Sequence, residues 1–293
     1  MNQTKFNRRK YIPWIFIPCI LALVIQFLAG IMTIQGCVVL AIGSFKGESY
    51  LELVTHLANV MMNEMNDMLY LLYVIPGIVV FAILYKQLFG NGIKLSFKGI
   101  SKNVVATVGG VVLFCLGMQY VSVYLLNSLS VAFPSWLEEY QEIIEMAGIS
   151  NEMTVAMFIY TILLGPICEE LIFRGITYKA ATKVMPYYLA IIVQAVLFGA
   201  FHMNALQASY AIVIGLGLGY IMYLYDNIIL TMFIHIIYNF LGTYGMTYLP
   251  IGGNTLISFF LWMLGALVVT YISILLLRKG STVIKEDNIL SDI

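Results

Sequence analysis

The chain has 293 residues, of which 61% are hydrophobic and 10% are charged, and its mean hydropathy is +0.92. Soluble domains are about half apolar and about a quarter charged. The composition therefore excludes a cytosolic enzyme, a disordered chain and a nucleic-acid binder with a basic face. The 15 Lys and Arg residues balance the 15 Asp and Glu residues, so the information in the charges lies in their positions. The composition predicts an integral membrane protein.

Apolar runs long enough to cross a bilayer recur along the whole chain. A membrane helix needs roughly 17 to 25 mostly apolar residues. None of the runs alternates as a barrel strand does, so each is expected to be helical. The runs cover residues 12–34, 68–89, 103–126, 154–173, 186–203, 206–225, 228–247 and 255–277. The sequence predicts one all-α polytopic membrane domain over residues 1–293, with about eight transmembrane helices.

The basic residues lie almost entirely in the segments on one side of these runs. The first run is too long for a signal-peptide core and no Ala-x-Ala site follows it, so we expect it to be retained. With the N-terminus inside, 14 of the 15 basic residues lie inside and only Lys46 lies outside. The positive-inside rule then predicts that both termini are cytoplasmic, in a multi-pass protein of the cell membrane. The inside residues are Lys5, Arg8, Arg9, Lys10, Lys86, Lys94, Lys98, Lys102, Arg174, Lys179, Lys183, Arg278, Lys279 and Lys285.

The segments on the opposite side are acidic. Residues 127–153 contain Glu138, Glu139, Glu142, Glu145 and Glu152 and no basic residue. Within them, Ser135-Trp136-Leu137 followed by Glu138 and Glu139 has the pattern of a capped amphipathic helix that lies at the membrane interface, anchored by Trp136 and Tyr140. Residues 50–67 predict a second helix of this kind.

A few ionisable residues fall inside the apolar runs, where such residues are costly and usually functional. Glu170 and Arg174 are four residues apart, so on a helix they share a face and are expected to pair, which leaves Glu169 on another face. His202 and His235 lie in two other runs, and each has a polar or aromatic neighbour four residues away. Those neighbours are Phe198 and Asn239.

This set of residues permits several kinds of chemistry. A carboxylate and an imidazole can take a proton from a water and direct it at a carbonyl, while a second imidazole and an amide stabilise the oxyanion. One Glu and two His side chains can also bind zinc with an open fourth position, although no HExxH motif is present. Ionisable chains in membranes serve as proton relays as well. Hydrolysis, ion or proton translocation and simple helix pairing all remain open from the residues alone.

The depths of these residues in the membrane differ. Counted at about 1.5 Å per residue from the inner boundary, Glu169 and His235 lie roughly 15 and 12 Å deep, and His202 roughly 24 Å. For the three to meet, the fifth helix must tilt strongly or begin well after Pro186.

Three stretches resemble the motifs of one family. Glu169 to Arg174 resembles EExxxR, Phe198 to His202 resembles FxxxH, and His235 to Asn239 resembles HxxxN. These are the motifs of the CPBP (CAAX protease and bacteriocin-processing, or Abi) intramembrane proteases, in the family's order. The resemblance covers residues 154–245, which would form the catalytic core. Within this family, the chain is similar to the CAAX prenyl endopeptidases.

The resemblance implies a glutamate-dependent intramembrane endopeptidase. Its catalytic residues would be Glu169 as general base, His202 holding the water, and His235 with Asn239 as the oxyanion hole. Glu170, Arg174 and Phe198 would support them. No cofactor would be required. The alternative is a divalent metal such as zinc, held by the glutamate and the two histidines.

The expected partners are the lipid bilayer and a peptide or membrane-protein substrate, with no nucleic acid. The expected role of the protein is peptide-precursor processing or bacteriocin self-immunity. The alternative function is a non-catalytic scaffold or immunity protein that binds a peptide or a partner membrane enzyme.

A glycine run inside one apolar stretch has a structural interpretation. Gly215, Gly217 and Gly219 follow no predicted strand, so a nucleotide-binding loop is excluded. Their spacing predicts close packing of the sixth helix against a neighbour.

Overall fold

The computed structural model describes residues 8–90, 103–146 and 153–281, and within these ranges every regular element is helical. The all-α prediction is confirmed for this part of the chain. Some charged residues used to predict the topology lie outside the described ranges, namely Lys5, Lys94, Lys98, Lys102, Glu152 and Lys285.

Six helical stretches among the described residues are long and apolar enough to cross a membrane. The chain is therefore a multi-pass membrane protein. The six are α1 (Pro13–Ser44), which continues the short helix η1 (Arg8–Tyr11), α2 (Tyr50–Phe89), α3 (Val104–Ala132), the composite stretch Val155–Ala181, α9 (Ala205–Tyr225) and α11 (Leu256–Gly280).

Two further apolar helices are shorter. They are α8 (Tyr187–Phe201), with 15 residues, and α10 (Ile228–Thr243), with 16 residues. At 1.5 Å per residue they are about 22 to 24 Å long, less than the hydrocarbon core of about 30 Å. Each of the eight predicted runs therefore has a helix, but only six of these helices have the length of a full crossing.

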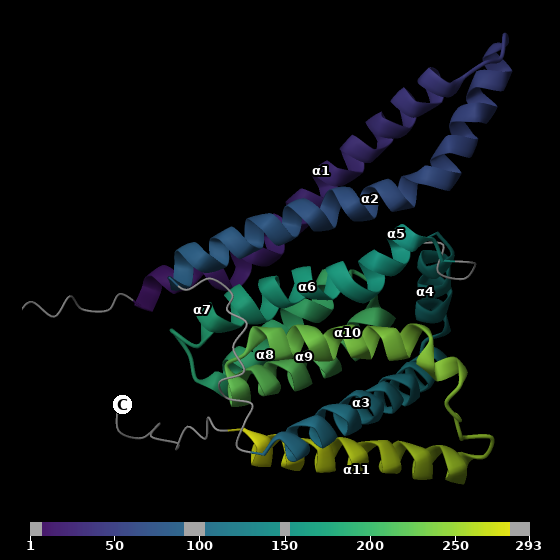
Figure 1. Ribbon diagram of the computed structural model, residues 1–293. Helices are drawn as coiled ribbons and strands as arrows, with labels where there is room; N and C mark the ends of the chain where they lie inside the picture. The colour runs from purple at the N-terminus through teal and green to yellow at the C-terminus, as the bar shows by residue number, and fades with distance from the viewer. Residues whose placement is uncertain (1–7, 91–102, 147–152, 282–293) are drawn as a thin grey trace, which may run out of the picture.

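Helices α1 and α2 form a long hairpin that leans away from the other helices at one end (Figure 1). The prediction of a separate helix over residues 50–67 is wrong, because α2 runs without a break for 40 residues. No Gly or Pro interrupts residues 50–75. A capping box starts the helix: the Ser49 hydroxyl accepts from the Glu52 N–H at 3.2 Å, and the Glu52 carboxylate accepts from the Ser49 N–H at 3.4 Å.

The remaining helices form a bundle in which α3 lies along α11 and α8 along α9 (Figure 1). Glycines permit the second contact. A Cβ at Gly215 would lie 3.2 Å from the Ala195 Cα, so the two helix backbones approach closely at this point. The close packing predicted for the glycine run is confirmed.

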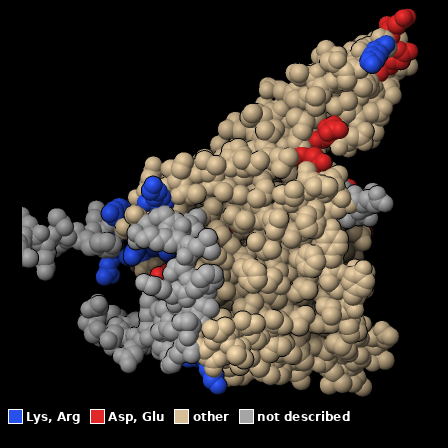
Figure 2. Space-filling view, in the orientation of Figure 1, with Lys and Arg blue, Asp and Glu red and all other residues tan. Residues whose placement is uncertain are grey.

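The charges separate along the molecule. The first residues of α1 and the last residues of α11 lie at the same end (Figure 1), as an even number of crossings requires. Figure 2 shows Lys and Arg gathered at that end, and acidic side chains with one basic side chain at the far tip of the α1–α2 hairpin. This separation is the pattern from which cytoplasmic termini were predicted.

The predicted amphipathic helix is α4 (Pro134–Met146), which buries none of its residues fully. It begins one residue earlier than expected, at Pro134. Trp136 stacks on Phe133 with 4.3 Å between ring centroids, and the Tyr140 hydroxyl lies 3.4 Å from the Tyr210 hydroxyl in α9. Helix α4 is thus a surface helix attached to the bundle through aromatic side chains.

Candidate active site

The fourth apolar stretch is an irregular helix. It consists of α5 (Val155–Phe158), the π-helical η2 (Ile159–Leu164), α6 (Gly165–Glu170), the π-helical η3 (Leu171–Tyr178) and α7 (Lys179–Ala181). π-Helical turns are rare and often occur at functional sites. Both motif carboxylates lie in α6, between the two π-helical segments.

Pro166 explains one unusual contact in this stretch. The Gly165 N–H donates to the Tyr160 carbonyl in the π pattern, so the next carbonyl, of Thr161, would take its hydrogen bond from residue 166. Proline has no N–H. The side-chain Nδ2 of Asn239 in α10 donates to the Thr161 carbonyl instead, at 3.0 Å. This bond fixes the carboxamide and uses one of its two N–H groups.

Glu170 and Arg174 form a buried ion pair. Arg174 Nη1 lies 2.9 Å from Glu170 Oε1, and both side chains are 0% exposed. The predicted pairing is confirmed. The guanidinium also lies over the Phe198 ring, 4.6 Å from its centroid. Phe198 therefore contacts the charged pair directly, from α8.

Glu170 also holds His235. The His235 Nδ1 lies 2.9 Å from Glu170 Oε1, and its Nε2 lies 3.6 Å from Glu169 Oε2. Because a carboxylate only accepts hydrogen bonds, Nδ1 carries the proton of this bond, and Nε2 is the nitrogen that faces Glu169. His235 is 3% exposed and the Glu169 side chain is 18% exposed. The structure thus places one histidine between the two motif carboxylates.

His202 also contacts Phe198. It caps the C-terminus of α8, where its Nδ1 is 2.9 Å from the Phe198 carbonyl oxygen. The Phe198 ring centroid is 5.0 Å from that of His202 and 5.7 Å from that of His235, and both pairs are nearly perpendicular. In the described residues no hydrogen bond or ion pair joins His202 to Glu169. Helix α8 begins at Tyr187, so a late start of the fifth helix does not account for the depth of His202.

The residues named as alternative zinc ligands are Glu169, His202 and His235. Across the described ranges, no three His, Cys, Asp or Glu side chains lie close enough together to hold a metal ion.

An aromatic wall beside α6 was not identified from the sequence. Cys168 approaches α2 closely at Gly77, where a Cβ would lie 3.0 Å from the thiol sulfur. One turn away, the Tyr73 ring meets Tyr160 edge-on at 6.5 Å, and Tyr160 stacks on Tyr70 at 4.4 Å. These contacts join α2 to the π-helical segment, and no spacing within one helix predicts them.

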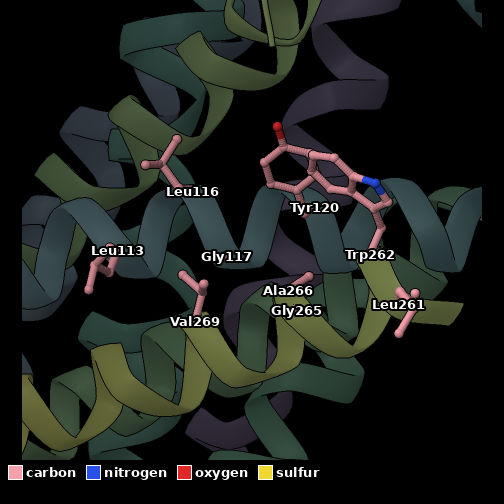
Figure 3. A pocket seen from close by; sticks show the side chains of 9 residues that line it. All are labelled: Leu113, Leu116, Gly117, Tyr120, Leu261, Trp262, Gly265, Ala266 and Val269. Carbon is pink, nitrogen blue, oxygen red and sulfur yellow. The ribbon is translucent and has the colours of Figure 1, made fainter. Parts of the chain in front are cut away.

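A separate cavity of about 490 Å³ lies between α3 and α11. Figure 3 shows its lining, which includes Leu113, Leu116, Trp262 and Val269. Its lining has no Asp, Glu, Lys, Arg or His side chain. The chemistry-bearing side chains are instead those of α6, η3, α8 and α10.

Comparison with known proteins agrees with this location. No curated protein and no solved structure matches the chain. The family model for "Type II CAAX prenyl endopeptidase Rce1-like" matches residues 151–241. This match spans the irregular fourth stretch and reaches into α10, so it includes all three motifs. Over residues 151–241 the chain is therefore similar to the Rce1-like, type II CAAX prenyl endopeptidase family, the same family that the three motifs resemble.

Proposed function

We propose that the protein is an intramembrane endopeptidase that hydrolyses a peptide bond by water attack, with Glu169 as general base. The observation that carries the proposal is the position of Glu169, which is partly exposed and 3.6 Å from an imidazole nitrogen of His235. That imidazole is itself held by a buried carboxylate at 2.9 Å. The family match over the same residues supports this chemistry.

The water is activated between Glu169 and His202. The Nδ1 of His202 faces the Phe198 carbonyl and so carries a proton, which leaves Nε2 of the neutral ring as an acceptor. A water that donates one hydrogen to this nitrogen and the other to Glu169 has its lone pairs directed at the substrate carbonyl. No contact between the two side chains is needed for this role.

His235 and Asn239 stabilise the oxyanion. Asn239 uses one N–H on the Thr161 carbonyl and keeps the other for the substrate. His235 donates from Nε2 when its ring is protonated, and Glu170 stabilises that positive charge through Nδ1. Donors held in place before the reaction stabilise the developing charge without reorganisation.

Glu169 takes the proton from the water and later returns it to the leaving group. The water oxygen forms a bond to the carbonyl carbon as its proton passes to the Glu169 carboxylate. The oxyanion then reforms the carbonyl, the C–N bond breaks, and the Glu169 carboxylic acid returns the proton to the leaving amine. The products are a new carboxylic acid and a new amine, and transfer of the acid's proton to the amine gives a carboxylate and an ammonium group. No metal has a part in these steps.

The substrate is a peptide or membrane protein presented within the bilayer. The matched family is described as acting on CAAX prenyl substrates, and its CPBP relatives include bacteriocin-processing proteins. We propose that this chain acts in peptide-precursor processing or bacteriocin self-immunity. It would do so in the cell membrane, with both termini cytoplasmic.

The test is cleavage by the purified protein in proteoliposomes. A panel of prenylated and unprenylated peptides and leader-bearing precursors is incubated with the wild type and with Glu169→Gln, and the products are identified by mass. We expect cleavage by the wild type alone. Equal product from both proteins contradicts the proposal. If no peptide is cleaved by either protein, and the Glu169→Gln/His235→Ala double variant keeps the cellular phenotype, the protein acts as a scaffold.

A further inference from the structure

Gln194 is a fully buried polar residue that neither the motifs nor the proposed chemistry uses. It lies in α8, one turn before Phe198, and is 0% exposed. Its side-chain nitrogen donates two hydrogen bonds, to the Ile191 carbonyl at 2.9 Å and to the Gly215 carbonyl at 2.8 Å. The second bond crosses from α8 to α9.

The Gly215 carbonyl has another side-chain donor. Arg174 Nη2 lies 3.4 Å from the same oxygen. One carbonyl of α9 therefore receives the amide of Gln194 from one side and the guanidinium from the other. The absence of a side chain at Gly219 makes room for this arrangement, because a Cβ there would overlap the Gln194 amide nitrogen.

Arg174 links this carbonyl to the candidate site. Its other terminal nitrogen pairs with Glu170 at 2.9 Å, and Glu170 holds His235 at 2.9 Å. Contacts of hydrogen-bond length thus run from α8 through α9 and η3 to α6 and α10. All four side chains in this chain of contacts are at most 3% exposed, so water does not compete for them.

Stability alone does not explain a glutamine at this position. Among the described residues, the Gln194 Oε1 and the Arg174 Nε have no hydrogen-bond partner. An unsatisfied buried polar atom is costly, and an apolar side chain of similar size avoids that cost. The amide therefore contributes something other than folding energy, and within the described residues its one long-range hydrogen bond is to the carbonyl shared with Arg174.

We infer that Gln194 is a positioning residue for His235: it fixes the Gly215 carbonyl, which orients Arg174 and, through Glu170, the imidazole. The inference rests on the proposed function. A guanidinium has five donors in a rigid planar fork, so fixing one side of the fork fixes the direction of the other.

The test is peptide cleavage by Gln194→Leu, with kcat and KM measured separately. Because one positioning hydrogen bond is lost, kcat is expected to fall by about tenfold with KM unchanged. The midpoint of thermal unfolding is expected to stay the same or rise, since the unsatisfied oxygen is removed. An unchanged kcat overturns the inference, as does a fall in kcat that matches a loss of folded protein.

Gln119→Leu is the matched control. Gln119 in α3 is 7% exposed, its Oε1 also lacks a partner among the described residues, and its amide also packs against a glycine, Gly242. It has no contact with Arg174. Its kcat is expected to stay within about twofold of the wild type. A tenfold loss of kcat in Gln119→Leu as well would show that the effect comes from general disruption of the core, and would overturn the inference.

A double-mutant cycle with Arg174→Lys tests the route of the effect. Lysine can still pair with Glu170, but it has no planar fork to orient. In that background Gln194→Leu is expected to lower kcat by less than about twofold, because coupled residues are not additive. A further tenfold loss of kcat in the Arg174→Lys background would be additive, and would show that Gln194 does not act through Arg174.

Gln194→Glu provides a second test of the inference if Gln194→Leu does not fold. A carboxylate beside the guanidinium competes with Glu170 for Arg174, so kcat is expected to fall by at least tenfold. Wild-type kcat in this variant overturns the inference. Absence of cleavage by the wild type overturns the proposed function and this inference with it, whereas an active wild type with fully active Gln194 variants overturns the inference alone.

Discussion

Glu169 and Glu170 are adjacent in the chain but have opposite surroundings, and replacing each by glutamine should separate folding from catalysis. Glu170 is 0% exposed and neutralises an equally buried Arg174 at 2.9 Å. Glu170→Gln leaves the guanidinium without its counter-charge. Removing one partner of a buried ion pair costs about 3 to 5 kcal/mol.

The groups that remain around Arg174 place the expected loss of stability at the lower end of that range. The Phe198 ring at 4.6 Å and the Gly215 carbonyl at 3.4 Å remain to solvate the charge. A desolvated cation–π contact is worth about 2 kcal/mol. We therefore expect a loss of about 3 kcal/mol, which lowers the midpoint of thermal unfolding by about 6 to 12 °C. Circular dichroism in detergent measures it.

Glu170→Gln should also lower kcat by about 100-fold, because His235 loses the carboxylate that holds its Nδ1 and that stabilises positive charge on the ring in the proposed mechanism. Glu169→Gln should differ in both respects. Its side chain is 18% exposed and, among the described residues, its only ion-pair contact is 3.6 Å long, so unfolding should change by less than about 1 kcal/mol while cleavage is lost. If the two variants unfold at the same temperature, the assignment of separate roles to the two carboxylates is refuted.

Three further predictions follow from particular contacts. Asn239→Leu should lower kcat by about 100-fold or more and destabilise the fold by about 1 to 3 kcal/mol, because it removes an oxyanion donor and leaves the Thr161 carbonyl unsatisfied; full activity in steady-state assays would contradict this. Chelation with EDTA or phenanthroline should leave the cleavage rate unchanged, and a loss restored by zinc would show that a metal is required. Gly215→Ala should destabilise the protein by about 1 to 3 kcal/mol, since its Cβ would lie 3.2 Å from Ala195, whereas the control Gly265→Ala, whose Cβ meets no atom within 4 Å, should not; equal melting curves would argue against tight α8–α9 packing.

The sequence predicted most of the helices because hydropathy reports which residues avoid water. It misjudged the α1–α2 hairpin for the same reason. Polar residues over 50–67 lower the hydropathy of that segment, but polar residues do not by themselves end a helix, and the capping box at Ser49 lies before them. The start of α2 is therefore set by this local backbone signal and not by polarity.

Within the site, contacts along one helix were predictable and contacts between helices were not. The Glu170–Arg174 pair follows from a spacing of four residues. The contact between Glu170 and His235 spans 65 residues and two helices, so no periodicity reports it. The bond from Asn239 to the Thr161 carbonyl depends on a π-helical turn before Pro166, and a motif does not encode the carbonyl that such a turn leaves open.

The central claim is that Glu169 activates the water that cleaves the peptide. The most direct test is the cleavage rate of one identified peptide by the wild type and by Glu169→Gln, in the same liposomes and at equal amounts of folded protein. We expect at least about a 100-fold lower rate for the variant, which is the lower limit for losing a general base. A Glu169→Gln variant that cleaves at the wild-type rate would contradict it.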